Sequence, residues 1–487
     1  MIIGVDAGTS VVKSVAFAEN GDVLRVSARP TTTRSPLSGH TEQDPEEVIA
    51  AVGETIREIA HDEVPSMIGI TAQGDGVWLM DAEGTPTRPA ILWSDARAAG
   101  IVERWMGDGT AAAAFLRSGN MLFPGAAAPT LRYLKESDPS ALAGAVTAGY
   151  CKDAIIQRIT GVRATDESDA SLPFFDPVAR VYDPELLRLY GVEELAHLLA
   201  PVDPAPGAIR PLNAAGAALT GLPVGTAVHA GPFDLCATMI GAGAANPGDA
   251  LVIVGTTLGC GVMTDNGTPG DQFAGMLLCM PKRDRWVRVM PAMIGTPSLE
   301  WVLELTRTTY EEIDPLLAST APGAGGVMCL PLLSPAGERA PFVDPSARGQ
   351  LVGLSLETTR AELLRALCEG IAYAARHCIE AGGLTDGGRI FLSGGGMKSA
   401  QWRQVLADVL GRPLLLARQP EVGARGAAMA ALDAAGTPYD RDAWTTPDGA
   451  VMPNPERASF YAQGYMEYRS RVDAAMGHWS GPRWKSA

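Results

Sequence analysis

The sequence is poor in the residues that usually hold structural metals. It has six histidines and seven cysteines in 487 residues, with no C-x-x-C pair and no H-E-x-x-H motif. A structural zinc site is therefore not expected. The odd number of cysteines, scattered through apolar stretches, indicates reduced thiols rather than a disulfide framework. We therefore predict a cytoplasmic protein.

Long hydrophobic runs and an excess of positive charge are also missing. No apolar run reaches the length of about 18 residues that a membrane-spanning helix needs, and the first residues lack the basic segment of a signal peptide. With 39 basic and 55 acidic residues, the net charge is −16. This charge disfavours nucleic acid or an anionic membrane as a partner. It does not disfavour an anionic nucleotide, which needs only a local positive site.

The chain is too long for one hydrophobic core, and two of its stretches share a pattern. The opening MIIGVDAGTSVVKSVAFAENGDVL indicates a strand, a tight turn, a second strand, an Asn-Gly turn and a third strand. GDALVIVGTTLGCGVMTDNGTP repeats this order as far as its own Asn-Gly turn. Gly255-Thr256 follow Gly8-Thr9 by 247 residues, and Asn266-Gly267 follow Asn20-Gly21 by 246. This spacing indicates either an internal duplication or two unrelated hairpins.

Helical patterns surround both hairpins. Asp44 followed by Pro45 is typical of a helix N-terminus, and Thr359 with Glu362 predicts a capping box. A strand, a triple-glycine turn and a helix are expected over residues 389–411. Strands that alternate with helices predict an α/β fold in which helices cover the sheets. A domain boundary is expected near residues 241–249, which are small and include glycine and proline.

The first turn carries groups that suit a phosphate. Thr9 and Ser10 offer hydroxyl and amide donors, and Lys13 offers a positive charge. Asp6 is suited instead to a hydrated Mg²⁺, which prefers one or two carboxylates together with water. The sequence contains no G-x-x-x-x-G-K-[ST] motif, so it is not a P-loop protein. Taken alone, this turn is more simply explained as an ordinary hairpin.

Two turns in the second half could complete a nucleotide site. Gly255 and Thr256 offer the same donors as the first turn, and two such turns facing each other would hold a triphosphate. A later turn would admit a base or ribose against bare backbone, and it comprises Gly394, Gly395 and Gly396. Ser399 stands where a Rossmann motif requires a third glycine, so that motif is not met. Each turn could also be an ordinary tight turn.

A further group of polar residues follows two predicted strands. GITAQGDGVWLMD supplies Gln73 and Asp75, and AILWSDARAAG supplies Trp93 and Asp95. Amide, carboxylate and indole groups together hold a polyhydroxylated ligand, because they bond its hydroxyls and cover its C–H groups. Alternatively, Asp95 pairs with Arg97 or caps a helix, and Trp93 belongs to the core.

Asp234 lies in HAGPFDLCATMIGAG, a stretch of otherwise apolar and small residues. A carboxylate is costly to bury there unless it is paired or used. It could cap a helix that begins at Leu235. It could equally be a general base that accepts the proton of a substrate hydroxyl during phosphoryl transfer.

Together and in this order, the motifs resemble the FGGY family of carbohydrate kinases, within the actin-like ATPase superfamily. The resemblance covers nearly the whole chain, and its landmarks include IIGVDAGTSVVKSVAF, YCKDAIIQRITGVRATDESDAS, AGPFDLCATMIGAG, LPLLSPAGERAPFVDPSARGQLVGL and LSGGGMKSAQWRQVLADVLG. It implies two ribonuclease-H-like α/β domains with a cleft between them, formed by residues 1–243 and 244–487. It also implies transfer of the γ-phosphoryl group of ATP·Mg²⁺ to a hydroxyl of a small sugar or polyol.

The resemblance implies roles for the residues above. Asp234 matches the catalytic base, and Asp6 would bind Mg²⁺, through water. The predicted nucleotide site comprises Thr9, Ser10, Lys13, Gly255, Thr256, Gly394, Gly395, Gly396 and Ser399. The predicted site for the acceptor, the sugar or polyol that receives the phosphoryl group, comprises Gln73, Asp75, Trp93, Asp95 and Asp234.

The acceptor itself is less defined. Relatives that act on glycerol have Arg-Glu after the glutamine, and those that act on D-xylulose have Met-His there and Asn after the catalytic Asp. This chain has Gly74-Asp75 and Leu235, and it resembles most the branch that handles erythritol and L-xylulose-type substrates. Ribulose, ribitol, glycerol and gluconate are alternatives, and a homodimer is possible. An actin-like or chaperone-like ATPase without a sugar acceptor and a non-catalytic sugar-binding protein are the rival classes.

Overall fold

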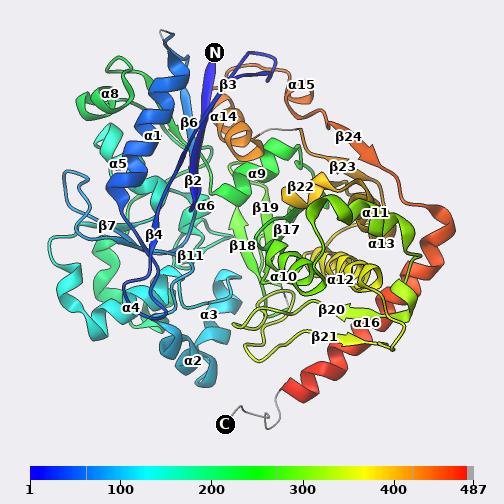
Figure 1. Ribbon diagram of the computed structural model, residues 1–487. Coiled ribbons are helices and arrows are strands. Elements are labelled where there is room, and N and C mark those ends of the chain that lie inside the picture. Colours follow the sequence, from blue (N-terminus) through cyan, green and yellow to red (C-terminus); the bar gives the residue numbers. More distant parts are fainter. Residues whose placement is uncertain (62, 271, 419–420, 480–487) are drawn as a thin grey trace.

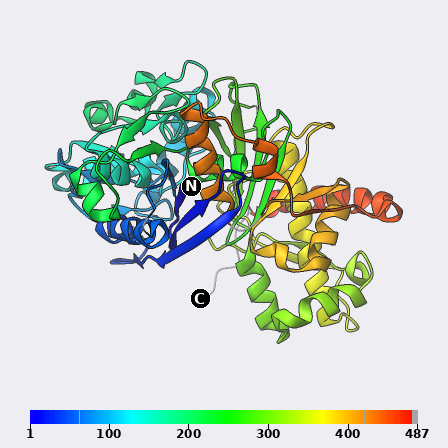
Figure 2. The same ribbon diagram turned by 90° about the horizontal axis from the view of Figure 1, so that it is seen from above.

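A computed structural model describes residues 1–61, 63–270, 272–418 and 421–479, which form two lobes, each built on one large sheet. Figures 1 and 2 show the first lobe in blue to green and the second in green to red. The central strand β1 (Ile2–Ala7) pairs antiparallel with β2 (Val11–Phe17) and parallel with β6 (Ile68–Ala72). The first sheet has the order β14 (Ile209–Pro211), β15 (Ala227–Ala230), β6 (Ile68–Ala72), β1 (Ile2–Ala7), β2 (Val11–Phe17) and β3 (Val23–Pro30).

The second sheet repeats this pairing. Its central strand β16 (Ala250–Val254) pairs antiparallel with β17 (Leu258–Thr264) and parallel with β22 (Ile390–Ser393). The two hairpins noted in the sequence therefore occupy equivalent places. The α/β prediction is therefore confirmed. The order is β18 (Met276–Cys279), β19 (Trp286–Ala292), β17 (Leu258–Thr264), β16 (Ala250–Val254), β22 (Ile390–Ser393), β23 (Leu414–Leu416) and β24 (Gly449–Val451).

Helices cover the sheets, and several begin where the sequence predicts. Asp44 accepts a hydrogen bond from the Glu46 amide at the start of α1 (Pro45–Ala60), and Thr359 and Glu362 form the capping box of α12 (Arg360–Ala381). The helices of the first lobe are α1 (Pro45–Ala60), α2 (Ala99–Gly107), α3 (Thr110–Ser118), α4 (Ala127–Ser137), α5 (Cys151–Thr160), α6 (Glu167–Ala170), α7 (Pro184–Tyr190), α8 (Ala214–Thr220) and α9 (Asp234–Ala242). Those that follow are α10 (Thr296–Thr306), α11 (Ile313–Ser319), α12 (Arg360–Ala381), α13 (Ala400–Leu410), α14 (Val422–Ala434), α15 (Arg441–Thr445) and α16 (Ala458–Trp479).

Short elements complete the lobes. The short strands are β4 (Thr33–Arg34), β5 (Glu42–Gln43), β7 (Trp78–Met80), β8 (Ala90–Ile91), β9 (Thr147–Gly149), β10 (Thr165–Asp166), β11 (Phe175–Asp176), β12 (Val181–Tyr182), β13 (Val202–Asp203), β20 (Met328–Leu330) and β21 (Gln350–Val352). Short 3-10 helices span Pro139–Leu142, Glu193–Leu198, Tyr310–Glu312, Ala324–Gly326, Gly395–Lys398 and Pro455–Arg457. In the part of the chain that the structure describes, no helix is long and apolar enough to span a bilayer.

Two helices, α9 and α14, lie between the sheets, and we call them the central helix pair (Figure 1). Cys236 and Met239 of α9 pack in one cluster with Leu251 and Phe391 of the second sheet. Ala424 and Ala428 of α14 pack instead with Val15 and Phe17 of the first sheet. A helix that comes late in the chain thus completes the core of the first lobe. The predicted boundary at residues 243/244 remains a prediction.

Glycines let the backbone of α14 approach its neighbours. A Cβ atom on Gly4 of β1 would lie 2.0 Å from the Ala424 carbonyl oxygen, and one on Gly69 of β6 would lie 2.1 Å from the Ala427 carbonyl oxygen. Between the two helices, a Cβ on Gly426 would lie 1.7 Å from the Ala237 carbonyl oxygen. Any larger residue at these positions would separate the central helix pair from the sheet or from each other.

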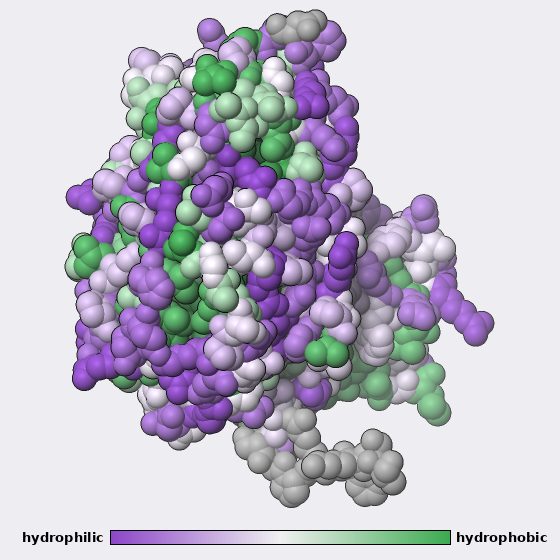
Figure 3. Space-filling model, turned by 90° about the vertical axis from the view of Figure 1, so that its left-hand side faces the viewer, coloured by the Kyte–Doolittle hydropathy of each residue, from purple (hydrophilic) through white to green (hydrophobic). Residues whose placement is uncertain are grey.

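The outer face of the first lobe has a different character. Hydrophilic residues predominate on it, and hydrophobic residues occur in small groups between them (Figure 3). Such scattered apolar residues are normal on a solvated surface. The tight apolar packing is therefore found between the sheets and their helices.

The central contact predicts the effect of a single methyl group. Gly426→Ala should destabilise the protein by about 1–3 kcal/mol or more, because backbone atoms cannot yield to the new Cβ. For a domain of this size, each kcal/mol lowers Tm by about 2–4 °C. Gly100→Ala in α2, where the new Cβ would meet nothing within 4 Å, is the control and should leave Tm unchanged or raise it slightly, because alanine favours a helix more than glycine does. Equal Tm values for the two variants in a thermal melt would contradict this packing.

Candidate active site

The first candidate group lies where β1 ends. Asp6 of β1 stands opposite Lys13 of β2 and beside Thr71 of β6. None of the described residues donates a hydrogen bond to the Asp6 carboxylate. A Cβ on Gly423, near the start of α14, would lie 2.4 Å from its Oδ2 atom. Burial raises the pKa of Asp6 to about 6, although the charge of Lys13 partly offsets this effect.

Lys13 already has a partner from the second half of the chain. Its Nζ atom lies 2.9 Å from Oε2 of Glu421, which precedes α14. The Lys13 side chain is nevertheless 38% exposed, so a phosphate could reach its ammonium group. Ser10 is exposed at the tip of the same turn.

Thr9 lies on the other side of this turn, and its hydroxyl is fully engaged. The hydroxyl donates to Oε1 of Gln73 at 2.7 Å and accepts from Nε1 of Trp93 at 3.1 Å. Gln43 donates to the Thr9 carbonyl oxygen and accepts from Gln73. In this conformation the Thr9 side chain therefore belongs with Gln73 and Trp93, and a nucleotide contact by Thr9 remains a prediction.

The turns of the second half lie side by side. Gly394 adopts φ +97°, and a Cβ there would lie 2.5 Å from the carbonyl oxygen of Val254, the residue before Gly255. Thr256 is exposed at the β16–β17 turn, and Gly395 is exposed with open space around it. The triple-glycine turn and the Gly255-Thr256 turn thus lie against each other, and each exposes one small residue, Gly395 and Thr256.

Two of the predicted nucleotide residues have clear structural contacts. Gly396 packs closely, since a Cβ there would lie 2.6 Å from Cγ1 of Val254. The Ser399 hydroxyl caps α13: it accepts from the Trp402 amide at 3.0 Å and bonds Asp314 of α11. A contact of Ser399 with a nucleotide remains a prediction.

Asp234 is the first residue of α9, and one of its oxygens is unsatisfied. Oδ1 is buried, and no partner for it exists among the described residues. The preceding residue, Phe233, is held by its amide, which donates to Oγ of Ser168 at 2.8 Å. Burial raises the pKa of Asp234 to about 8, with a further rise from the charge of Asp6. Such an orphaned carboxylate is a candidate for acid–base chemistry.

Gln73, Asp75 and Trp93, which we call the polar cluster, follow β6 and β8. Gln73 and Asp75 are buried, and Trp93 is partly exposed. Asp75 has the left-handed φ of +57°, and its Oδ1 accepts from the Ala127 amide at 3.3 Å, at the start of α4. Burial raises its pKa to about 7.

Asp95 is bound within the first lobe. Its carboxylate accepts two bonds at 2.9 Å from the Arg97 guanidinium, and the Thr41 amide donates to it at 2.6 Å. The pairing with Arg97 that the sequence left open is thus present. A direct contact between Asp95 and a ligand remains a prediction.

Three further residues enter the site without having been singled out in the sequence. Arg339 lies over the rings of Trp93 and Phe123, at 5.8 Å and 5.1 Å from their centroids. Glu421 pairs with Lys13, as above. Arg339 stands in the landmark SPAGERAPF, which could have drawn attention to it, whereas nothing in the sequence alone marks Phe123 or Glu421.

The landmark YCKDAIIQRITGVRATDESDAS gains a structural explanation. Lys152 is buried, lies 2.6 Å from Asp169 and also pairs with Asp166. Asp166 accepts from the Ser168 hydroxyl at 2.5 Å, and Ser168 accepts from the Phe233 amide. This buried network therefore holds the backbone that carries Asp234.

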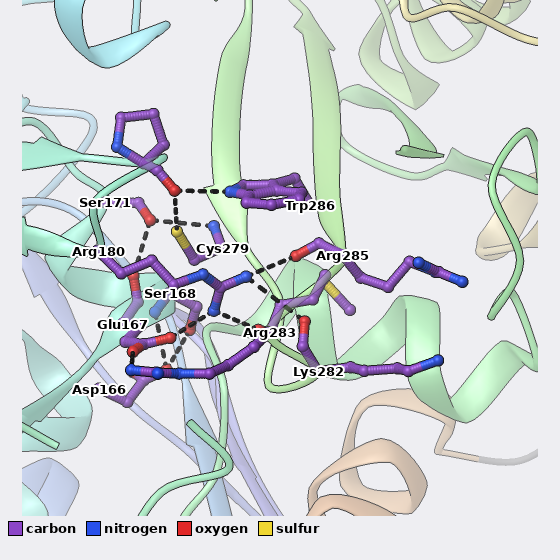
Figure 4. Close-up of polar contacts among 12 residues, drawn as sticks. Asp166, Glu167, Ser168, Ser171, Arg180, Cys279, Lys282, Arg283, Arg285 and Trp286 are labelled. Atoms are coloured by element: carbon purple, nitrogen blue, oxygen red, sulfur yellow. Dashed lines mark hydrogen bonds and ion pairs between the residues drawn. The ribbon is translucent and has the colours of Figure 1, made fainter. Parts of the chain in front are cut away.

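Arg180 joins the same region to the second lobe (Figure 4). Its guanidinium pairs with Glu167 and donates to the carbonyl oxygens of Met280 and Arg285, at 3.0 and 2.9 Å, in the hairpin between β18 and β19. It also lies 5.0 Å above the Trp286 ring. This contact joins the two lobes through residues that do not belong to the polar cluster.

Known structures share this two-lobed arrangement. The crystal structure of xylulose kinase from Rhodospirillum rubrum aligns with a TM-score of 0.90 and 28% identity, over 98% of this chain and 99% of that one. Erythritol kinase of Brucella abortus is 30% identical over 96% of this chain and 95% of its own length. Xylulose kinase of Klebsiella pneumoniae is 31% identical, over 95% and 96% respectively. The fold is thus that of two-domain, actin-like sugar kinases.

The family models define the chain further. The N-terminal domain model of the FGGY family of carbohydrate kinases matches residues 1–241, and the C-terminal domain model matches residues 250–435. The protein belongs to the FGGY family of carbohydrate kinases. It is therefore a phosphotransferase of a family that uses ATP and carbohydrate acceptors, and the resemblance noted in the sequence is confirmed.

The raised pKa of Asp234 predicts how stability depends on pH. The folded state holds this proton up to a pH of about 8, whereas the unfolded chain releases it near a pH of about 4. The folded state therefore binds more protons between these values, so the free energy of unfolding falls as pH rises through that window.

Asp234→Asn removes this dependence. The variant and the wild type should have similar Tm values near pH 5. The variant should become more stable than the wild type as pH rises toward 8. Each kcal/mol of difference in the free energy of unfolding should raise its Tm above that of the wild type by about 2–4 °C. Thermal melts of the ligand-free proteins at half-unit pH steps measure this. A difference in Tm that stays constant with pH would refute the assigned pKa.

Proposed function

We propose that this kinase transfers the γ-phosphoryl group of ATP to a hydroxyl of a small polyol or ketose, with erythritol or a ketopentose such as xylulose favoured, in the cytoplasm. The single observation that carries the proposal is the buried Oδ1 of Asp234, which has no partner among the described residues at the N-terminus of α9. A hydroxyl that lies against this oxygen would satisfy it and give up its proton to it.

The reaction requires a base that is free when the acceptor binds. In the ligand-free protein, the pKa of Asp234 of about 8 means that the carboxyl group is mostly protonated at neutral pH. As the acceptor oxygen forms its bond to the γ-phosphorus and the bond to the β-phosphate oxygen breaks, the ionised Asp234 accepts the hydroxyl proton. Cationic groups near Asp6 would favour the ionised form, because Asp6 is one of the charges that raise the pKa of Asp234.

Nucleotide binding is assigned to both lobes. Lys13 and the exposed Ser10 offer a charge and a donor to the phosphates from the first lobe, and the exposed Thr256 offers a donor from the second. The bare surface at Gly395 suits the adenosine. Gly394 and Gly396, on either side of it, belong to the same proposed set and let the turn pack closely against Val254. Gly255, Thr9 and Ser399 complete the proposed set. The N-termini of α9 and α14 add partial positive charge that favours anionic groups.

The surroundings of Asp6 fit a magnesium ion held largely by water and phosphate. Its carboxylate receives no hydrogen bond from the described residues and faces the bare backbone of Gly423. The described residues include no group of three or more His, Cys, Asp or Glu side chains that could hold a metal by themselves. One open carboxylate matches the preference of Mg²⁺ for few protein ligands. When bound, Mg²⁺ would neutralise charge on the phosphate oxygens.

The choice of acceptor rests on the residues around the polar cluster. Gln73 and Asp75 offer an amide and a carboxyl to hydroxyl groups, Trp93 borders them, and Asp95 supports the same region through Arg97. A Cβ on Gly74 would lie 1.8 Å from the Phe233 ring. Side chains such as the Arg or Met found at this position in glycerol and D-xylulose relatives would therefore displace Phe233. This supports an acceptor of the erythritol or L-xylulose type.

An ADP-release assay across tetritols, pentitols, ketopentoses, ketohexoses, gluconate and glycerol tests the proposal. Stimulation by a tetritol or ketopentose above all others is expected. Preference for gluconate, ribitol, ribulose or glycerol would correct the acceptor. ATP hydrolysis that ignores every acceptor would contradict the proposal. We propose no nucleic acid or membrane as partner, and a homodimer remains a prediction.

Removal of the proposed base should affect the reaction far more than binding. We expect Asp234→Asn to lower kcat by about 10²–10⁴-fold, with the Kd for ADP within about twofold of the wild type in a calorimetric titration. Asp473→Asn on the exposed face of α16 is the matched control and should leave both values unchanged. Near-normal turnover of Asp234→Asn would eliminate Asp234 as the base.

Gly423→Ala tests the role of Asp6. The new Cβ would come within 2.4 Å of Asp6 Oδ2, so the carboxylate must move, and a shifted metal ligand commonly weakens metal affinity by about 10–100-fold. The Mg²⁺ concentration for half-maximal activity should rise accordingly, while Tm without Mg²⁺ changes little. Gly100→Ala serves again as the control. An unchanged Mg²⁺ requirement would contradict the proposal that the metal binds near Asp6.

A further inference from the structure

The segment between β20 and β21 carries the motif SPAGERAPF, to which no role has been assigned so far. It belongs to the second lobe, yet Arg339 reaches Trp93 and Phe123 of the first lobe. Gln272 bonds the carbonyl oxygen of Pro341 in the same segment. The long yellow-green connection that approaches the first lobe in Figure 1 is this segment.

The backbone at Arg339 is held rigidly on the second lobe. Glu338 is 3% exposed, and its Oε1 accepts from the amides of Met293 and Arg339 at 2.7 and 2.9 Å. The backbones of Glu338 and Asp344 exchange two hydrogen bonds of 2.9 Å. Arg339 is thus presented from a fixed support rather than from a loose loop.

The guanidinium of Arg339 has donors to spare. Its Nε donates to the Pro291 carbonyl oxygen at 2.9 Å, which leaves the two terminal amino groups. Neither amino group donates to any residue in the described part of the chain. The positive charge also acts on Asp75, whose pKa it lowers against the larger effect of burial. Unused donors therefore lie beside the polar cluster, next to a carboxyl that can accept.

We propose that Arg339 binds the acceptor, donating from its terminal amino groups to one or two oxygens of the polyol or ketose while Asp75 accepts from a neighbouring hydroxyl. This rests on the proposed function and assigns part of the acceptor specificity to the second lobe. A guanidinium is a donor only, and its planar fork suits two neighbouring oxygens. The acceptor would thereby contact both lobes, and its binding would favour the arrangement in which they meet.

The test compares Arg339→Gln with Arg339→Lys, using the best acceptor from the panel. Loss of a hydrogen bond from a charged group typically weakens binding by about tenfold or more. Arg339→Gln should raise the KM for the acceptor by at least that factor, with kcat within about fivefold and the Kd for ADP unchanged. Arg339→Lys, which keeps the charge but not the fork, should give an intermediate KM.

Arg180→Gln is the matched control, because Arg180 also ties one lobe to the other, through Glu167 and the β18–β19 hairpin (Figure 4), and none of its contacts in the described part of the chain involves the polar cluster. It should lower Tm and leave the KM unchanged. An equal rise in KM for Arg180→Gln and Arg339→Gln would mean that loosening of the lobes, not contact, is responsible, and would overturn the proposal. An unchanged KM for Arg339→Gln would overturn it as well.

Deoxy analogues of the best acceptor give a second readout. For the analogue that lacks the oxygen bound by Arg339, the wild type should already show the raised KM, and Arg339→Gln should add little further. If Arg339→Gln raises the KM by the same factor for every analogue, Arg339 has no direct contact and the proposal fails. If the wild type phosphorylates no acceptor at all, the proposed function fails first, and this inference falls with it.

Discussion

The contact on which the whole arrangement depends is the seating of α14 against β1, β6 and α9. At Gly4, Gly69 and Gly426 backbone meets backbone, and no side chain intervenes. A helix from the end of the chain is thereby locked into the first lobe. As a consequence, the backbone of Gly423 lies against the Asp6 carboxylate, and Glu421 forms an ion pair with Lys13. The site is assembled from both halves of the chain because this helix is shared between them.

The electrostatics of the ligand-free protein follow from the same seating. Burial raises the pKa of Asp6, Asp75 and Asp234 to about 6, 7 and 8, and none of the three carboxyls forms an ion pair with a described residue. Buried carboxylates without a partner oppose folding. A substrate that supplies such a partner would therefore stabilise the folded protein. The buried Lys152, by contrast, pairs with both Asp166 and Asp169, and this network supports the backbone before Asp234. Paired charges thus support the backbone before Asp234, whereas the three carboxyls without an ion pair lie at the proposed site.

Much of the fold could be predicted from the sequence because its signals are local. The strand–turn–strand pattern, the Asp44 cap and the Thr359–Glu362 capping box each depend on neighbouring residues, and all three are present. Contacts between distant segments left no such signal. Nothing near Glu421 predicts its pairing with Lys13, and Arg339 meets Trp93 only through the folded lobes. Asp95 is a different case. The sequence indicated its pairing with Arg97, but it did not decide between that pairing and a role in ligand binding.

The central claim is that, at the interface between the lobes, Asp234 contacts the acceptor hydroxyl and Asp6 binds the Mg²⁺ that accompanies the phosphates. A crystal structure with a non-hydrolysable ATP analogue, Mg²⁺ and the best acceptor tests it most directly. We predict an acceptor oxygen at hydrogen-bond distance from Asp234, about 2.6–3.2 Å, in line with the γ-phosphate, and Mg²⁺ joined to Asp6 through water. An acceptor bound with no oxygen in contact with Asp234 would contradict the account.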